Sequence, residues 1–116
     1  MPQVYNKDDH DTLVRKIAGN MSRHNAGLYR ILTGESRIHS AAGSNADIQL
    51  VSIASDAVIL SILVETSSSI TLDRARLVWQ SLAAEGPLEI ALPKGMASRA
   101  RHFCRKINVK AKLIEY

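Results

Sequence analysis

Aromatic residues are scarce in this chain, since phenylalanine, tryptophan and tyrosine make up only 4% of its 116 residues. Modules that bind single-stranded nucleic acid commonly stack the bases on exposed aromatic side chains. The low aromatic content counts against a protein of that class. It also predicts a hydrophobic core built mainly from aliphatic side chains.

Cysteine is nearly absent, because Cys104 is the only one. A single cysteine excludes an internal disulfide and a zinc site built from cysteines, and it is typical of a reducing compartment. The longest apolar run, from Ala57 to Val64, is interrupted by Ser61 and is too short to cross a bilayer. The polar, acidic N-terminus lacks the pattern of a signal peptide. We therefore expect a cytoplasmic protein without a membrane-spanning segment.

Positive charge is concentrated at the C-terminus. Residues 1–93 carry 8 basic and 10 acidic side chains, a net of −2, whereas residues 94–116 carry 7 basic and 1 acidic, a net of +6. A basic segment attracts the phosphates of nucleic acid, although a solvated helix face has the same pattern. The candidate DNA contacts are Lys94, Arg99, Arg101, Arg105 and Lys106.

The spacing of apolar residues predicts a single α/β domain over residues 1–116. Helical periodicity covers 13–21, 75–82 and 97–107. Strands are expected at 28–32, 37–40, 47–53, 57–65, 88–92 and 109–114. Hairpins in the first half and strand–helix–strand alternation in the second give a mixed central β-sheet flanked by helices. The strand at 57–65 is apolar on both faces and should be central, and the strand at 109–114 should form an edge that could pair two copies as a homodimer.

Two carboxylates interrupt these apolar strands. Asp47 begins one strand, and Glu65 ends the next. Burial of either side chain is costly unless it is paired or binds a cation. If the strands are neighbours, the two carboxylates can converge at one end of the sheet and, with waters and a phosphate oxygen, form a Mg²⁺ site. Such an ion polarises a phosphodiester and activates water.

Several short motifs resemble those of a known superfamily. They are Asn45-Ala46-Asp47-Ile48, Ile62-Leu63-Val64-Glu65-Thr66, Ser69-Ile70-Thr71 opening a helix with Trp79-Gln80, and Leu92-Pro93-Lys94-Gly95. Together they resemble the PD-(D/E)XK nuclease-like superfamily, nearest to its small members that are similar to restriction endonucleases and Holliday-junction resolvases. The resemblance covers most of the chain, best from 46 to 105. It implies a restriction-endonuclease-like α-β-β-β-α-β core and Mg²⁺-dependent cleavage of DNA.

The resemblance also assigns roles to individual residues. Asp47 and Glu65 match metal-binding and catalytic acids, with Ala46 where proline is usual. If Glu65 is the glutamate of the second motif, the lysine position falls on Ser67. If Glu65 stands at the lysine position, the preceding acid falls on Leu63.

Other polar residues could complete this site. They are Gln80 from the second helix, Asp9 or Asp11 as a third acid from the first, and Lys94 from a loop. Two hypotheses remain open: a Mg²⁺-dependent nuclease acting on DNA, and an inactive nuclease-fold module that binds nucleic acid or a protein partner.

The remaining chemically distinctive residues receive structural interpretations. The histidines lack metal-ligand spacing and are interpreted as surface residues: His10, His24, His39 and His102. Cys104 lies on a helical apolar stripe and is expected to be buried. Trp79 is expected in the core, with a polar contact to its indole N–H.

Overall fold

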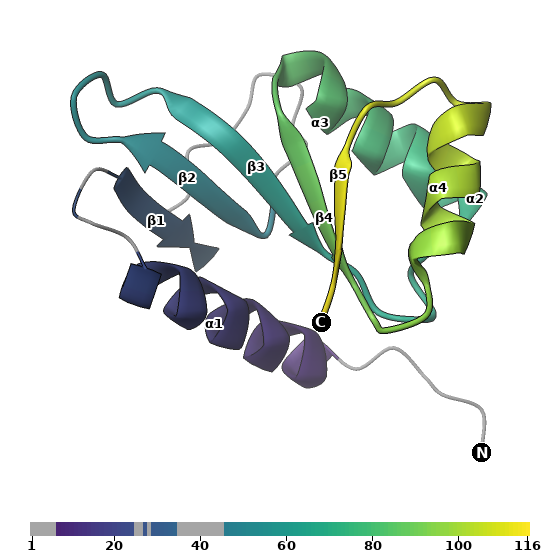
Figure 1. The fold of residues 1–116 in the computed structure, drawn as a ribbon, viewed down its shortest axis with the longest axis horizontal. Coiled ribbons are helices and arrows are strands. Elements are labelled where there is room, and N and C mark those ends of the chain that lie inside the picture. The colour runs from purple at the N-terminus through teal and green to yellow at the C-terminus, as the bar shows by residue number, and fades with distance from the viewer. Residues whose placement is uncertain (1–6, 25–26, 28, 35–45) are drawn as a thin grey trace.

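A computed structural model of the chain describes residues 7–24, 27, 29–34 and 46–116. Its strands form one mixed sheet in the order β1-β2-β3-β4-β5. The first three are antiparallel neighbours, and β3, β4 and β5 are parallel (Figure 1). The predicted α/β class, with a mixed sheet flanked by helices, is confirmed. The strands are β1 (Tyr29–Thr33), β2 (Ile48–Ser52), β3 (Val58–Val64), β4 (Leu88–Leu92) and β5 (Lys112–Glu115).

Helices cover both faces of the sheet. On one side lies α1 (Lys7–His24). The other side carries α4 (Ala97–Lys106) and one continuous helical run, made of α2 (Leu72–Arg74), η2 (Ala75–Trp79) and α3 (Gln80–Glu85). Figure 1 shows α1 along the lower edge of the β1–β3 half and α4 beside β5.

The core is divided into two layers by β3. Successive side chains of a strand point to opposite faces, so Ile62 and Val64 pack toward α1 while Leu63 packs toward the other helices. All three are about 1% exposed, which agrees with the central position predicted for this strand. The largest fully buried side chains are mostly aliphatic, as the composition predicted.

The helical run after β3 starts where the sequence predicted. Thr71 is the N-cap, and its hydroxyl oxygen accepts the N–H of Arg74 at 3.2 Å. A single π-helical stretch follows, in which the N–H of Gln80 donates to the carbonyl oxygen of Ala75. It carries Trp79 into the core. The expectation that this tryptophan makes a polar contact is wrong, because its indole N–H has no hydrogen-bond partner among the described residues.

The C-terminal strand is an edge strand, as predicted, but it is shorter. It starts at Lys112 rather than at residue 109. Asn108 adopts a left-handed φ of 56°, and the N–H of Val109 bonds to the carbonyl oxygen of Cys104. The chain from 107 to 111 is therefore used to turn from α4 back to the sheet.

The predicted strand at 37–40 lies outside the described residues. No helix among the described residues is long and apolar enough to span a membrane.

Candidate functional site

The start of β2 and the end of β3 meet at one edge of the sheet, as the two-carboxylate hypothesis required. Asp47 precedes β2, and its Oδ2 accepts the backbone N–H of Val64 at 2.7 Å. A pocket of about 470 Å³ opens beside this contact. We call it the strand-end pocket, and its lining residues are His10, Asp47, Val64, Ser68, Ser69 and Arg74.

His10 of α1 closes one side of the strand-end pocket. Its Nε2 lies 3.0 Å from the carbonyl oxygen of Val64 and 3.3 Å from Oδ1 of Asp47. A carbonyl oxygen only accepts, so Nε2 carries the proton that it donates. The hydrogen bond to Asp47 raises the pKa of His10, burial opposes it, and Asp11, 3.6 Å from Nδ1, adds to the rise.

The interpretation of His10 as a surface residue is wrong, because its side chain is only 13% exposed. The sequence contained a signal for its position. His10 lies four residues before Val14, a buried residue of α1. Residues spaced by four share one face of a helix, so His10 extends the inward stripe of α1 by one turn.

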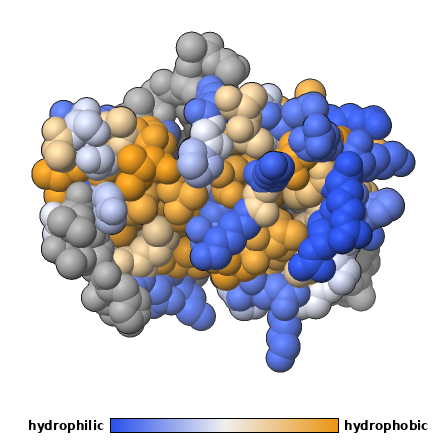
Figure 2. All heavy atoms as spheres, turned by 45° about the horizontal axis from the view of Figure 1, so that its top comes forward, coloured by the Kyte–Doolittle hydropathy of each residue, from blue (hydrophilic) through white to orange (hydrophobic). Residues whose placement is uncertain are grey.

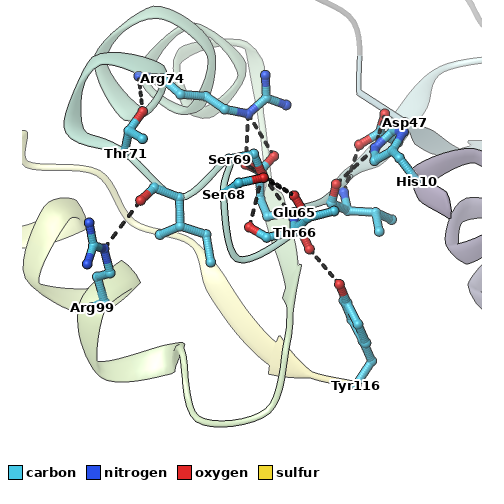
Figure 3. A network of polar contacts seen from close by, with 12 residues as sticks. His10, Asp47, Glu65, Thr66, Ser68, Ser69, Thr71, Arg74, Arg99 and Tyr116 are labelled. Carbon is cyan, nitrogen blue, oxygen red and sulfur yellow. Dashed lines mark hydrogen bonds and ion pairs between the residues drawn. The ribbon is translucent and has the colours of Figure 1, made fainter. Parts of the chain in front are cut away.

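Glu65 is tied down inside the protein. Its carboxylate is 0% exposed. The Nε of Arg74 donates to both of its oxygens, at 2.7 and 3.0 Å, and the Ser69 hydroxyl donates at 2.8 Å (Figure 3). Burial raises the pKa of Glu65, Arg74 and Ser69 oppose the rise, and Asp47 adds to it. The Tyr116 hydroxyl donates to the backbone carbonyl of Glu65 at 2.7 Å and secures the end of the strand.

The side chains gathered at this site do not fit a Mg²⁺ ion. Magnesium requires near-octahedral oxygen ligands, but all four carboxylate oxygens of Asp47 and Glu65 already lie near an N–H or O–H donor. Asp11 approaches His10 at its other ring nitrogen, and the side chain of Asp9 lies outside the described part of the chain. Within the described ranges, no group of three histidine, cysteine, aspartate or glutamate residues can hold a metal ion.

Gln80 is not brought to the two carboxylates. Its amide donates to the carbonyl oxygen of Ile107 at 3.4 Å, after the end of α4. Ser67, one of the alternative lysine positions, is exposed in the loop after β3.

Two of the predicted DNA contacts lie at the same edge of the sheet as the strand-end pocket. Lys94 follows β4, whose carboxyl end lies beside that of the parallel β3. Arg99 is in the first turns of α4, and its Nε donates to the carbonyl oxygen of Ile70, near the start of α2, at 3.3 Å. Its guanidinium carbon also lies 5.5 Å from the centre of the Phe103 ring. Both cationic side chains are exposed.

The other basic residues of α4 face elsewhere. Arg101 and Arg105 line a groove between α4 and β5, together with Lys110. Lys106 is exposed but is not part of the groove lining. The basic side chains that follow one another in the sequence therefore lie on two separate surfaces of the protein.

The pairing of His10 predicts a pH-dependent stability. The pKa of His10 in the folded protein is raised from 6.5. The stability that protonated His10 contributes is therefore fully present below pH 6.5 and is lost as the pH rises through the folded pKa. The difference in unfolding free energy between wild type and His10→Gln should therefore shrink from pH values near 6 upward. Urea denaturation across this range measures it, and NMR titration should place the midpoint of His10 above 6.5.

Replacement of an exposed histidine serves as the control. His102→Gln, on α4, should leave the pH dependence unchanged. A difference between wild type and His10→Gln that stays constant with pH would contradict the pairing.

Comparison of the chain with protein-family models, with curated proteins and with solved structures gives no significant match.

Proposed function

We propose that this chain is a nuclease-fold module that binds nucleic acid through its phosphates at the strand-end pocket, without metal-dependent cleavage. The order α1-β1-β2-β3, then a helical run, then β4 supports the fold part of the proposal. It contains the α-β-β-β-α-β core that the resemblance to the PD-(D/E)XK superfamily implies.

One observation carries the non-catalytic part. Each of the two carboxylates has a basic side chain of the protein at ion-pair distance: Nε2 of His10 lies 3.3 Å from Asp47, and Nε of Arg74 lies 2.7 Å from Glu65. These contacts engage the carboxylate oxygens that a metal-dependent nuclease would use as metal ligands. The absence of a lysine from the second motif agrees with this arrangement.

An arginine and serine side chains line the strand-end pocket, and side chains of these types suit a phosphate. A guanidinium presents five N–H donors in a planar fork that matches phosphate oxygens. Arg74 directs its Nε to Glu65, and Figure 3 shows its two terminal nitrogens turned away from that carboxylate. The Ser68 hydroxyl lines the same pocket and can donate as well, whereas the Ser69 hydroxyl already donates to Glu65.

The surroundings of the pocket add positive charge. Lys94 and Arg99 are exposed along the same edge of the sheet. Figure 2 shows strongly hydrophilic side chains at the right of the molecule, the side on which α4 lies in Figure 1. Contacts to phosphates position a nucleic acid without reading its bases. The expected binding is therefore independent of sequence.

The decisive experiment measures binding and cleavage of a fluorescent duplex DNA in EDTA and then in Mg²⁺. We expect binding by anisotropy in EDTA as well as in Mg²⁺, weakened by Mg²⁺ only as far as added cations compete for phosphates, and intact DNA on a denaturing gel. Calorimetry with Mg²⁺ and Mn²⁺ should give no stoichiometric binding. Cleavage that requires Mg²⁺ and is lost in Asp47→Asn would establish the nuclease hypothesis instead, and an absence of DNA binding in both buffers would refute the proposal.

A further inference from the structure

A groove between α4 and β5 lies apart from the strand-end pocket and has a volume of about 340 Å³. The charged side chains that line it are all basic: Arg101 and Arg105 from α4, and Lys110 from the segment before β5. Apolar residues, among them Cys104 and Leu113, complete the lining. The groove therefore combines a uniformly positive rim with an apolar surface.

The groove adjoins an open edge of the sheet. β5 is the last strand in the sheet order, and among the described residues it pairs with β4 alone. The N–H of Tyr116 donates to the carbonyl oxygen of Leu92 at 2.8 Å, so the backbone at this position faces β4. Alternate residues of a parallel strand turn their backbone groups to opposite sides. Leu113 and Glu115 therefore direct their N–H and C=O groups outward, where another strand can bond to them.

Side-chain directions link the open edge to the groove. Leu113 packs against the core cluster beneath α4. The Glu115 carboxylate accepts the N–H groups of Gly95 and Ala97, at 2.9 and 3.2 Å, beside the start of α4. Both side chains lie on the α4 face of β5. Every second side chain of a strand added to this edge would therefore stand on that face, beside the basic rim.

We propose that β5 and this groove dock an extended, acidic segment of a partner protein as an additional strand. Backbone hydrogen bonds to the outward groups of Leu113 and Glu115 hold the segment. Its acidic side chains meet Arg101 and Arg105, and its apolar side chains cover the apolar lining of the groove. The proposal does not depend on DNA binding at the strand-end pocket, because the two sites use different residues.

The chemistry of the groove favours a peptide over a nucleic acid. A phosphodiester backbone has no row of N–H and C=O groups to pair with the open edge of β5. It also gains little from the apolar lining contributed by Cys104 and Leu113. A peptide whose side chains at every second position are acidic and apolar in turn places both kinds on one face, and so matches the basic rim, the apolar lining and the edge together.

The test uses a fluorescein-labelled peptide of repeating Glu-Thr-Val-Thr, which places glutamate and valine on one face of a strand, with the full chain, at low salt. Fluorescence anisotropy should show saturable binding that is weakened at least about tenfold by the double replacement Arg101→Glu and Arg105→Glu. The matched control is Arg15→Glu with Lys16→Glu, which changes the net charge equally on exposed positions of α1 and should retain wild-type affinity. The same peptide with lysine in place of each glutamate should not bind.

A second measurement separates strand addition from simple charge attraction. Bound peptide should slow hydrogen exchange of the Leu113 and Glu115 amides, as measured by NMR. Binding that is equally weakened by both double replacements, or that leaves these amides unprotected, would overturn the proposal. The proposal would also be overturned if a duplex DNA displaces the peptide and the affinity for that DNA depends on Arg101 and Arg105. The same holds if light scattering shows that a second copy of the chain covers β5.

Discussion

Replacing Arg74 with alanine is expected to destabilise the protein by about 2–3 kcal/mol at neutral pH, because removal of one partner leaves a buried charge uncompensated. Both oxygens of the Glu65 carboxylate accept from Arg74, and the carboxylate is 0% exposed. After the replacement, Ser69 remains as its side-chain donor. The expected value lies below that of a fully buried ion pair because the Arg74 side chain is 34% exposed and water already screens it.

The loss should depend on pH in a defined direction. The pKa of Glu65 is raised from 4.5 by burial even with Arg74 present. Removal of the arginine raises it further. A carboxyl group whose folded pKa lies above its unfolded value contributes most stability below the unfolded pKa and loses that contribution as the pH rises through the folded one. The defect of Arg74→Ala should therefore be largest near neutral pH and should shrink as the pH falls toward 5.

Urea denaturation of matched variants measures this effect. Arg76→Ala removes an exposed arginine from the same helical run and should change the unfolding free energy by less than about 0.5 kcal/mol. Combining Glu65→Gln with Arg74→Ala removes the uncompensated charge and should recover part of the loss. An Arg74→Ala defect no larger than that of Arg76→Ala, or one that grows as the pH falls, would contradict the pairing.

The position of the two carboxylates could be predicted from the sequence, but their partners could not. Asp47 and Glu65 stand at the ends of apolar runs, and an antiparallel pairing brings such ends together. His10 and Arg74 come from α1 and α2, which pack on opposite faces of the sheet. Sequence patterns indicate which residues of a helix face inward, but not which strand end its first turn will reach.

One partner has a local signal in the sequence. Thr71 is the N-cap of the helical run, and Arg74 is the third residue after it. A residue in the first turn of a helix lies close to the loop that precedes the helix, and Glu65 begins that loop. An arginine at that position was a reasonable partner for a carboxylate expected to be buried.

Helix geometry explains why the basic segment divides into two surfaces. An α-helix turns by about 100° for each residue, so Arg99 and Arg101 point about 160° apart, whereas Arg101 and Arg105 share one face. The net charge of the segment counts these residues together and does not show that they lie on different faces of the helix. The structure directs Arg99 toward Ile70 and the strand-end edge, and it directs Arg101 and Arg105 toward β5.

DNA binding at the strand-end pocket should weaken about tenfold at low salt when Lys94→Gln and Arg99→Gln are combined, since each removes a phosphate-facing charge. A plot of log affinity against log salt concentration should become shallower by about 0.9 for each phosphate contact that is lost. The affinity of the double variant should therefore converge with that of wild type as salt is raised. Anisotropy titrations of one duplex at several salt concentrations measure both the affinity and the slope.

Two control variants make this result specific to the strand-end edge. Arg15→Gln with Lys16→Gln removes the same charge from exposed positions of α1 and should keep the wild-type slope. Arg101→Gln with Arg105→Gln should also keep most of the DNA affinity, because these side chains line the groove beside β5 instead. Equal losses of DNA affinity in all three variants would mean that binding depends only on the net charge of the protein. An affinity that does not change with salt would exclude phosphate contacts as the basis of binding. A loss confined to the Lys94→Gln and Arg99→Gln variant would instead support the proposed binding of nucleic acid beside the strand-end pocket.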